Sequence, residues 1–197
     1  MLNDKFKNFK LILASNSPRR RFLLKEAGFD FELRIQPESR EDYPLKMRPE
    51  LIPLYLAKMK ASAFEGLLES NEILITADTI VILNNRVLGK PKDFQEAFDM
   101  LTLLSGHRHE VITAVCLKSK NKEKIFSASS EVWFRKLSEL EITHYINEFK
   151  PYDKAGAYGV QEWIGYVGVE RIEGSFFNVM GFPIQMVYVE LEKFIEG

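Results

Sequence analysis

An aliphatic and β-branched segment, Ile73–Leu83, carries one carboxylate, Asp78, in its middle. This composition is typical of a buried strand, and the segment ends at the turn-forming pair Asn84-Asn85. A carboxylate among aliphatic side chains is costly unless it is paired, hydrogen-bonded or bound to a cation. Two interpretations follow. Asp78 either caps a turn between two short strands, or lies at a strand end and binds a metal or activates a water.

The rest of the chain alternates between strand-like and helix-like apolar patterns, which predicts an α/β architecture. Strands are expected over residues 10–14, 31–35, 110–117 and 125–134, with one or two short strands around 167–172. Helices are expected over residues 18–28, 52–68, 93–104, 138–149 and 183–194. Ser17 is the predicted N-cap of the first helix, and Ser138-x-x-Glu141 is a capping box. Residues 36–53 and most of 150–178 are expected to be loops, and no repeat or linker divides the chain, so we expect a single domain over residues 1–197.

Charge and cysteine content restrict the class of protein. The formal net charge is -1, from 27 basic and 28 acidic side chains, so no global basic field is available to bind nucleic acid. Cys116 is the only cysteine, which excludes an internal disulfide and favours a reducing compartment. The first residues have no apolar core of a signal peptide, and no apolar run reaches the roughly 18 residues that span a membrane. These features predict a soluble cytoplasmic protein with no nucleic-acid or membrane partner.

The segment Ser15-Asn16-Ser17-Pro18-Arg19-Arg20 is a candidate phosphate site between the first strand and the first helix. A helix N-terminus presents free N–H groups and partial positive charge, and guanidinium groups bind phosphate oxygens with paired hydrogen bonds. The segment is not a P-loop, because the required glycines and the Gly-Lys-Ser/Thr ending are missing. The alternative is that Ser17 only caps the helix and the arginines are solvated.

Three further features are weaker candidates. Lys60 and Lys90 are relevant only if the fold gathers them beside Asp78, since lysines are usually solvated surface residues. The glycine-rich segment Asp153–Gln161 could approach a ligand closely, and Gln161 could offer a donor and an acceptor to a base edge, although ordinary surface loops are also rich in glycine. His107 and His109 could share a strand face, but no third ligand nearby supports a zinc site.

Several of these motifs, taken together and in order, resemble the Maf family of nucleotide pyrophosphatases. The matching motifs are Leu13-Ala-Ser15-Asn-Ser17-Pro-Arg19-Arg20, Ala77-Asp78-Thr79-Ile-Val, Lys90-Pro91, Ser105-Gly106-His107 and Asp153-Lys-Ala-Gly-Ala-Tyr-Gly-Val-Gln161. The resemblance implies an α/β fold like that of inosine triphosphatases, with a long mixed β-sheet flanked by helices and two lobes with a central cleft. It also implies cleavage of a nucleoside triphosphate between its α- and β-phosphates, dependence on a divalent metal cation (Mg²⁺ or Mn²⁺), and a possible homodimer.

The resemblance assigns roles to individual residues. It implies that Asp78 is the proton acceptor and a metal ligand, together with a cleft glutamate that maps best to Glu41. Glu38 and Asp42 are rivals for that position. The implied substrate-binding residues are Ser15, Arg19, Arg20, Lys60, Thr79, Lys90 and Gln161.

Within the family, Arg19, Thr79 and Gln161 match the combination associated with dTTP and UTP hydrolysis. The Glu162-Trp163 pair and the stretch 164–169 depart from the family pattern, and an aromatic side chain there could alter base selection. Two alternatives stay open: a pyrophosphatase of the 7-methyl-GTP type, and a nucleotide-binding regulator of cell division that does not turn over its ligand.

Overall fold

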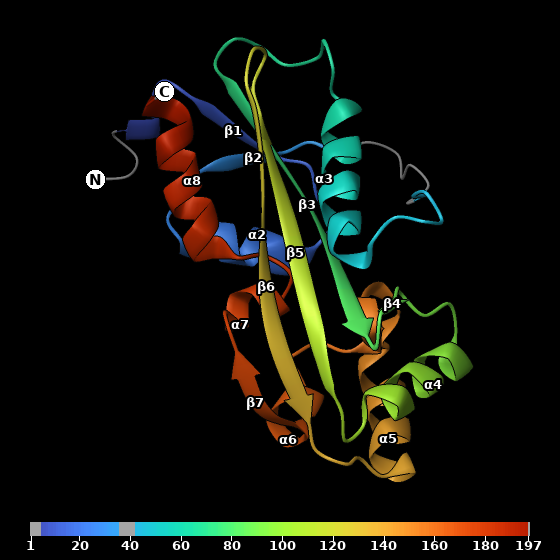
Figure 1. Cartoon of the computed structure of the whole chain (residues 1–197). Helices are drawn as coiled ribbons and strands as arrows, with labels where there is room; N and C mark the ends of the chain where they lie inside the picture. Colours follow the sequence, from blue (N-terminus) through green and yellow to red (C-terminus); the bar gives the residue numbers. More distant parts are fainter. Residues whose placement is uncertain (1–4, 36–41, 197) are drawn as a thin grey trace. The chain divides into compact units, whose positions relative to one another are not determined.

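The computed structural model describes residues 5–35 and 42–196, and its strands form one mixed sheet (Figure 1). The strands are β1 (Lys10–Leu13), β2 (Phe31–Leu33), β3 (Glu72–Leu83), β4 (Arg86–Leu88), β5 (Arg108–Lys118), β6 (Glu123–Phe134) and β7 (Val169–Glu173). Their order is β2-β1-β3-β5-β6-β7, with β4 paired to β3. Strand β1 is parallel to β2 and β3, whereas β4 is antiparallel to β3 and β7 to β6. The expected α/β class with a mixed sheet is confirmed.

The helices follow the expected alternation with strands. They are α2 (Pro18–Glu26), α3 (Ile52–Ser62), α4 (Phe94–Leu104), α5 (Glu139–Phe149), α6 (Trp163–Gly168), α7 (Phe176–Val179) and α8 (Ile184–Glu196), with 3₁₀ turns over Pro49–Leu51, Pro151–Asp153 and Ala155–Ala157. None of the helices in the described part of the chain has the length and apolar character needed to cross a membrane.

The chain divides into two compact units. Unit 1 comprises Met1–Asp78, Thr113–Ala128 and Gly181–Gly197, and unit 2 comprises Thr79–Ile112 and Ser129–Met180. Strands β3, β5 and β6 each begin in one unit and end in the other. A single domain over the whole chain stays a prediction.

In unit 1, helix α3 packs on one face of the sheet, and Figure 1 shows α8 on the other side of these strands. Strand side chains alternate between the two faces, so Leu74 and its neighbours at even positions of β3 share the face toward α3. The buried side chains of this core are Ile12, Ala57, Ala61, Phe64, Leu68, Leu74, Ala114 and Cys116. Burial raises the pKa of the Cys116 thiol to about 12, so this cysteine is an inert core residue.

Helix α3 is shorter than the apolar pattern predicts. It ends at Ser62 instead of Leu68, and Gly66 adopts a left-handed φ of 72° in the turns that follow. Phe64 and Leu68 nevertheless pack into the same core as the helix. Their four-residue spacing therefore matches helical periodicity although both residues lie beyond the end of the helix.

Strand β3 is continuous from Glu72 to Leu83, so both sequence-based placements of Asp78 are wrong. The aspartate lies in the middle of one long strand, neither at a strand end nor in a turn between two strands. Asn84 and Asn85 have φ values of 48° and 66°, as a two-residue hairpin turn requires, and they connect β3 to β4.

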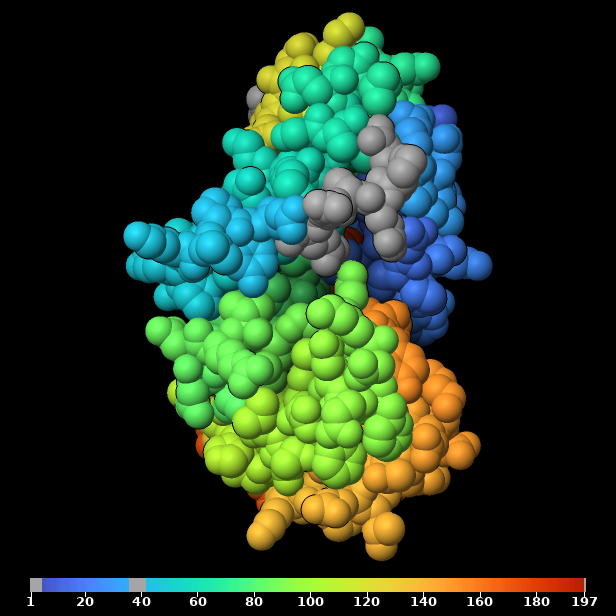
Figure 2. All heavy atoms as spheres, turned by 90° about the vertical axis from the view of Figure 1, so that its right-hand side faces the viewer, coloured from blue at the N-terminus to red at the C-terminus, as the bar shows by residue number. Residues whose placement is uncertain are grey.

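In unit 2, helices α4 and α5 pack together on a core that includes Leu101, Phe134 and Tyr145. Both helices lie at the surface of this unit in Figure 2, where α4 is light green and α5 orange. The predicted capping box of Ser138 and Glu141 opens α5 and is confirmed. Helices α6 and α7 occupy the region expected to be mostly loops.

His109 is buried in unit 2 and is a structural residue. Its Nε2 atom lies 2.8 Å from the Tyr158 hydroxyl, and its ring contacts Phe134 edge-on. Burial lowers the pKa of His109 to about 4, against the smaller opposing effect of a main-chain contact with His107. The folded protein therefore keeps this imidazole neutral at pH values where the unfolded chain protonates it.

We expect a pH-dependent loss of stability in unit 2 from this histidine. An unfolded histidine titrates near pH 6.5, so the unfolded state gains a proton below that pH and the folded state does not until about pH 4. Between pH 7 and pH 5.5, His109 should lower the unfolding free energy by about 1–1.5 kcal/mol. Urea unfolding followed by tryptophan fluorescence measures this, since Trp133 and Trp163 both belong to unit 2. The variant His109→Gln should lack this part of the pH dependence, and an unchanged dependence would contradict the assignment.

Candidate functional site

The N-terminus of α2 is positioned by parallel pairing of β1 with β3. Leu13 pairs with Ile75, and the Ala14 amide donates to the Ile75 carbonyl at 3.0 Å. The chain then leaves the sheet, and the buried Ser15 hydroxyl accepts a hydrogen bond from the Ser17 amide at 3.2 Å. Ser17 in turn caps α2 through the Arg20 amide, and Pro18 occupies the first turn, as predicted.

Arg20 connects this helix to the main chain next to Asp78. Its Nη1 group donates to the Ala77 carbonyl at 2.7 Å, and its Nε group donates to the Gly181 carbonyl at 2.9 Å. The alternative that Arg20 is merely solvated is therefore wrong. Arg19, one residue earlier, is half-buried. The guanidinium of Arg20 therefore lies beside Ala77, the residue directly before the candidate catalytic residue Asp78.

Asp78 and Lys60 form a partly buried ion pair. The Lys60 ammonium donates to Asp78 Oδ1 at 2.5 Å, and the Asp78 side chain is 8% exposed. The pair explains how an aspartate is tolerated within a long aliphatic strand, because the cation offsets the desolvation of the carboxylate. The fold thus brings Lys60 to Asp78, which the sequence alone left undecided.

A second contact between α3 and β3 holds this pair in register. The buried Thr76 hydroxyl donates to the Ala57 carbonyl at 2.7 Å. From Thr76 to Asp78 the strand advances about 6.6 Å and keeps the same face. From Ala57 to Lys60 the helix advances about 4.5 Å on nearly the same side. The Thr76 hydrogen bond therefore places the lysine over the aspartate.

The remaining predicted site residues fall in two groups. Thr79, Lys90 and Gln161 belong to unit 2. Thr79 directly follows Asp78 in β3, Lys90 is exposed after β4, and Gln161 is half-buried. Glu41 and Glu38 lie outside the described residues, and Asp42 is exposed at the start of the next described stretch.

Gln161 has a polar neighbour that sequence reasoning did not assign. Its Nε2 group donates to Glu162 Oε1 at 3.4 Å. Glu162 also accepts a hydrogen bond from the Tyr145 hydroxyl, and the Lys154 ammonium lies 3.2 Å from its Oε1 atom. The sequence signal for this neighbour is the departure from the family pattern at Glu162-Trp163, where the prediction concerns the aromatic side chain and not Glu162.

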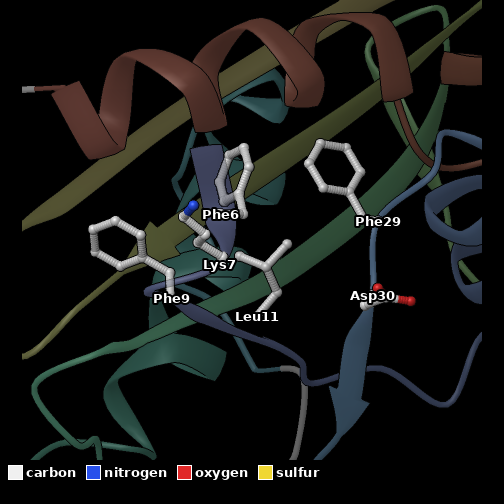
Figure 3. A pocket seen from close by; sticks show the side chains of 6 residues that line it. All are labelled: Phe6, Lys7, Phe9, Leu11, Phe29 and Asp30. Atoms are coloured by element: carbon white, nitrogen blue, oxygen red, sulfur yellow. The ribbon is translucent and has the colours of Figure 1, made fainter. Parts of the chain in front are cut away.

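Other candidate sites do not form. Within residues 5–35 and 42–196, no cluster of three or more histidine, cysteine or acidic side chains could hold a metal ion, so the zinc alternative has no support there. Figure 3 shows a separate pocket of unit 1, lined by Phe6, Lys7, Phe9, Leu11, Phe29 and Asp30. No predicted site residue lines this pocket.

One solved structure supports the assigned fold. The chain superimposes on a HAM1 protein from Coxiella burnetii with a TM-score of 0.50 and 13% identity, over 94% of this chain and 99% of the other. Identity this low is evidence of a shared fold alone.

Comparisons of the sequence identify the family. Among the similar curated proteins, a dTTP/UTP pyrophosphatase of Porphyromonas gingivalis is 49% identical, over 98% of this chain and 98% of its own length. One from Parabacteroides distasonis is 51% identical over 97% and 99%, and one from Flavobacterium psychrophilum is 51% identical over 97% of each chain. The family model described as Maf-like protein matches residues 10–194. The chain therefore belongs to the Maf family.

Proposed function

We propose that this protein hydrolyses dTTP and UTP to the nucleoside monophosphate and pyrophosphate. The observation that carries the proposal is the Asp78–Lys60 ion pair, held next to the N-terminus of α2 by the Arg20 hydrogen bond to Ala77. This arrangement places a carboxylate beside a helix end of the kind that binds phosphate. Curated relatives of about half identity and nearly equal length carry the name dTTP/UTP pyrophosphatase, which gives the substrate.

In this mechanism Asp78 accepts the proton of the attacking water. The water oxygen forms a bond to phosphorus, the bridging P–O bond between the α- and β-phosphates breaks, and the monophosphate and pyrophosphate separate. The site supplies positioning and charge stabilisation, which dominate catalysis of phosphoryl transfer. Lys60 fixes the Asp78 carboxylate, and the amides and hydroxyls around Ser15 bind phosphate oxygens.

Arg19, Arg20 and Lys90 complete the proposed phosphate contacts. Two N–H groups of Arg20 are already used by main-chain carbonyls, so this arginine first holds the site together. Guanidinium has five donors in a planar fork that suits phosphate oxygens, so the proposal adds a phosphate contact to the structural bonds of Arg20.

The residues present fit a divalent cation that arrives with the nucleotide. Mg²⁺ is usually held by one or two carboxylates together with substrate phosphates, and Asp78 is a carboxylate at the proposed phosphate site. Glu41 stays a predicted second ligand. Mg²⁺ or Mn²⁺ would supply positive charge that stabilises the charge developing on the phosphate oxygens.

Gln161 and Thr79 are the proposed base-selecting residues. Gln161 offers an amide to the Watson–Crick edge of the base, and Thr79 adds a hydroxyl. The homodimer implied by the family is also part of the proposal, and the mass measured by light scattering tests it.

A substrate panel tests the reaction and the base preference together. Purified protein is incubated with Mg²⁺ and, in separate reactions, dTTP, UTP, CTP, dATP or 7-methyl-GTP, and released pyrophosphate is measured. We expect rapid release from dTTP and UTP and little from the others. Preferred release from 7-methyl-GTP would assign the protein to the modified-purine type. Binding of dTTP without release from any nucleotide would instead support a regulator.

A further inference from the structure

The Gln161 side chain is held asymmetrically. Its Nε2 group donates to Glu162, whereas its Oε1 atom is buried and accepts no hydrogen bond from any residue in the described stretches 5–35 and 42–196. A buried carbonyl oxygen without a donor costs free energy, because it has lost its hydrogen bonds to water without replacement. A ligand that brings a donor to this oxygen would recover that free energy.

Glu162 determines which end of the amide carries which group. A carboxylate only accepts hydrogen bonds, so the part of the Gln161 amide that faces it must be the NH₂ group. The other end of the Gln161 amide is therefore the oxygen Oε1, which can only accept hydrogen bonds.

Glu162 is itself held from several sides. The Tyr145 hydroxyl donates to its carboxylate and accepts from the Gly159 amide at 3.0 Å. Lys154, whose side chain is 9% exposed, places its ammonium 3.2 Å from Glu162 Oε1. Burial and the neighbouring carboxylate raise the pKa of Tyr145, so the phenol remains a hydrogen-bond donor. The carboxylate is thus fixed by one neutral and one cationic donor.

The backbone of the segment is shaped around both side chains. A Cβ atom at Gly159 would lie 2.7 Å from the Glu162 carboxyl carbon and 2.8 Å from Gln161 Nε2. The main-chain carbonyl of Gln161 accepts a hydrogen bond from the Tyr166 hydroxyl at 2.6 Å. Glycine at position 159 therefore makes room for the Gln161–Glu162 contact.

We propose that Glu162 is a positioning residue that orients the Gln161 amide so that Oε1 accepts the N3–H group of uracil or thymine. The inference rests on the proposed role of Gln161 in binding the base. Uracil and thymine carry an N–H donor at ring position 3, whereas cytosine carries an acceptor nitrogen there. An amide fixed in this way favours the first two bases, and one that rotates freely loses this preference.

Substitution of Glu162 tests the orientation. In Glu162→Ala the amide of Gln161 is free to turn, so we expect KM for UTP and dTTP to rise about tenfold, the effect of one hydrogen bond, while kcat changes less than about threefold. The preference for UTP over CTP should fall by a similar factor. Glu162→Gln keeps an acceptor oxygen and should restore most of the binding. The control Glu148→Ala, at an exposed position of α5, should leave all constants unchanged.

The outcomes separate the inference from the function on which it rests. A rise in KM for Gln161→Ala with unchanged constants for Glu162→Ala would overturn the positioning role and leave Gln161 as a base-binding residue. Unchanged constants for Gln161→Ala would overturn the base-binding role itself. A loss of kcat alone in Glu162→Ala would also contradict the inference.

A measurement on the unaltered protein avoids any effect of substitution on folding. N3-methyl-UTP lacks the proposed donor but keeps the ribose and the triphosphate. We expect it to inhibit UTP hydrolysis at least tenfold more weakly than dTTP does. Inhibition as strong as that by dTTP would overturn the assignment of Gln161 Oε1 as the acceptor for N3–H.

Discussion

Replacement of Asp78 by asparagine should reduce kcat for UTP and dTTP by about 10²–10⁴-fold, because the variant lacks the proposed proton acceptor. The amide has the same shape, so the fold and nucleotide binding should survive. Lys60 would lose the charge of Asp78, but its side chain is 23% exposed, so water can solvate the ammonium group. Steady-state pyrophosphate release gives kcat, and equilibrium dialysis with UTP gives the binding constant.

Asp93→Asn is the matched control for this substitution. Asp93 is the N-cap of α4, and its carboxylate accepts from the Glu96 amide at 2.9 Å. Asparagine caps helices about as well as aspartate, so both activity and stability should be unchanged. Wild-type turnover in Asp78→Asn would remove Asp78 from its proposed role.

Glu72→Ala should lower the unfolding free energy by about 2–3 kcal/mol, because it removes the buried carboxylate of a partly buried, hydrogen-bonded ion pair. The Glu72 carboxylate is 2% exposed and accepts from Arg34 Nη2 at 2.6 Å and Nη1 at 2.9 Å. The Glu69 amide also donates to it at 3.1 Å. Urea unfolding followed by circular dichroism measures the loss.

The pH dependence gives an independent check of the same pair. The hydrogen bonds from Arg34 are the main cause that lowers the pKa of Glu72 from 4.5 to about 2. Its stabilising effect is therefore complete above pH 4.5 and is lost as the pH falls toward 2. Glu32→Ala is the control, since exposed Glu32 lies 3.5 Å from the same arginine and should contribute much less to stability than Glu72. Equal losses in the two variants would contradict the account.

Local signals in the sequence predicted local structure well. Ser17-Pro18 at the start of α2, the Ser138–Glu141 capping box and the Asn84-Asn85 turn are all confirmed. Each of these features depends on hydrogen bonds or backbone angles within a few residues, so the local residue types are sufficient to predict it.

Features that depend on distant partners were predicted less well. Asp78 was expected to interrupt a strand, but Lys60 from α3 offsets its burial and β3 continues. Thr76 and Asp78 are neighbours on one face of the strand, and this polar pair was the available signal for a polar partner on the covering helix. Helices α6 and α7 were missed because four to six residues are too few to establish a helical period.

The same distinction applies to the candidate site. Motifs along the chain identified Ser15, Arg20, Lys60 and Asp78, and the fold of unit 1 links them through β1, α2, α3 and β3. The sequence did not indicate that Arg20 binds main-chain carbonyls or that Lys60 pairs with the aspartate. These contacts join residues that are 18 or more positions apart, so local sequence patterns do not predict them.

Product analysis of a UTP hydrolysis reaction tests both the bond that is cleaved and the role of Asp78. Wild-type protein and Asp78→Asn are incubated with UTP and Mg²⁺ at equal concentrations, and nucleotides and phosphates are separated by anion exchange. We expect UMP and pyrophosphate in equal amounts from the wild type and almost none from the variant. Formation of UDP and phosphate, or equal product from both proteins, would contradict this expectation.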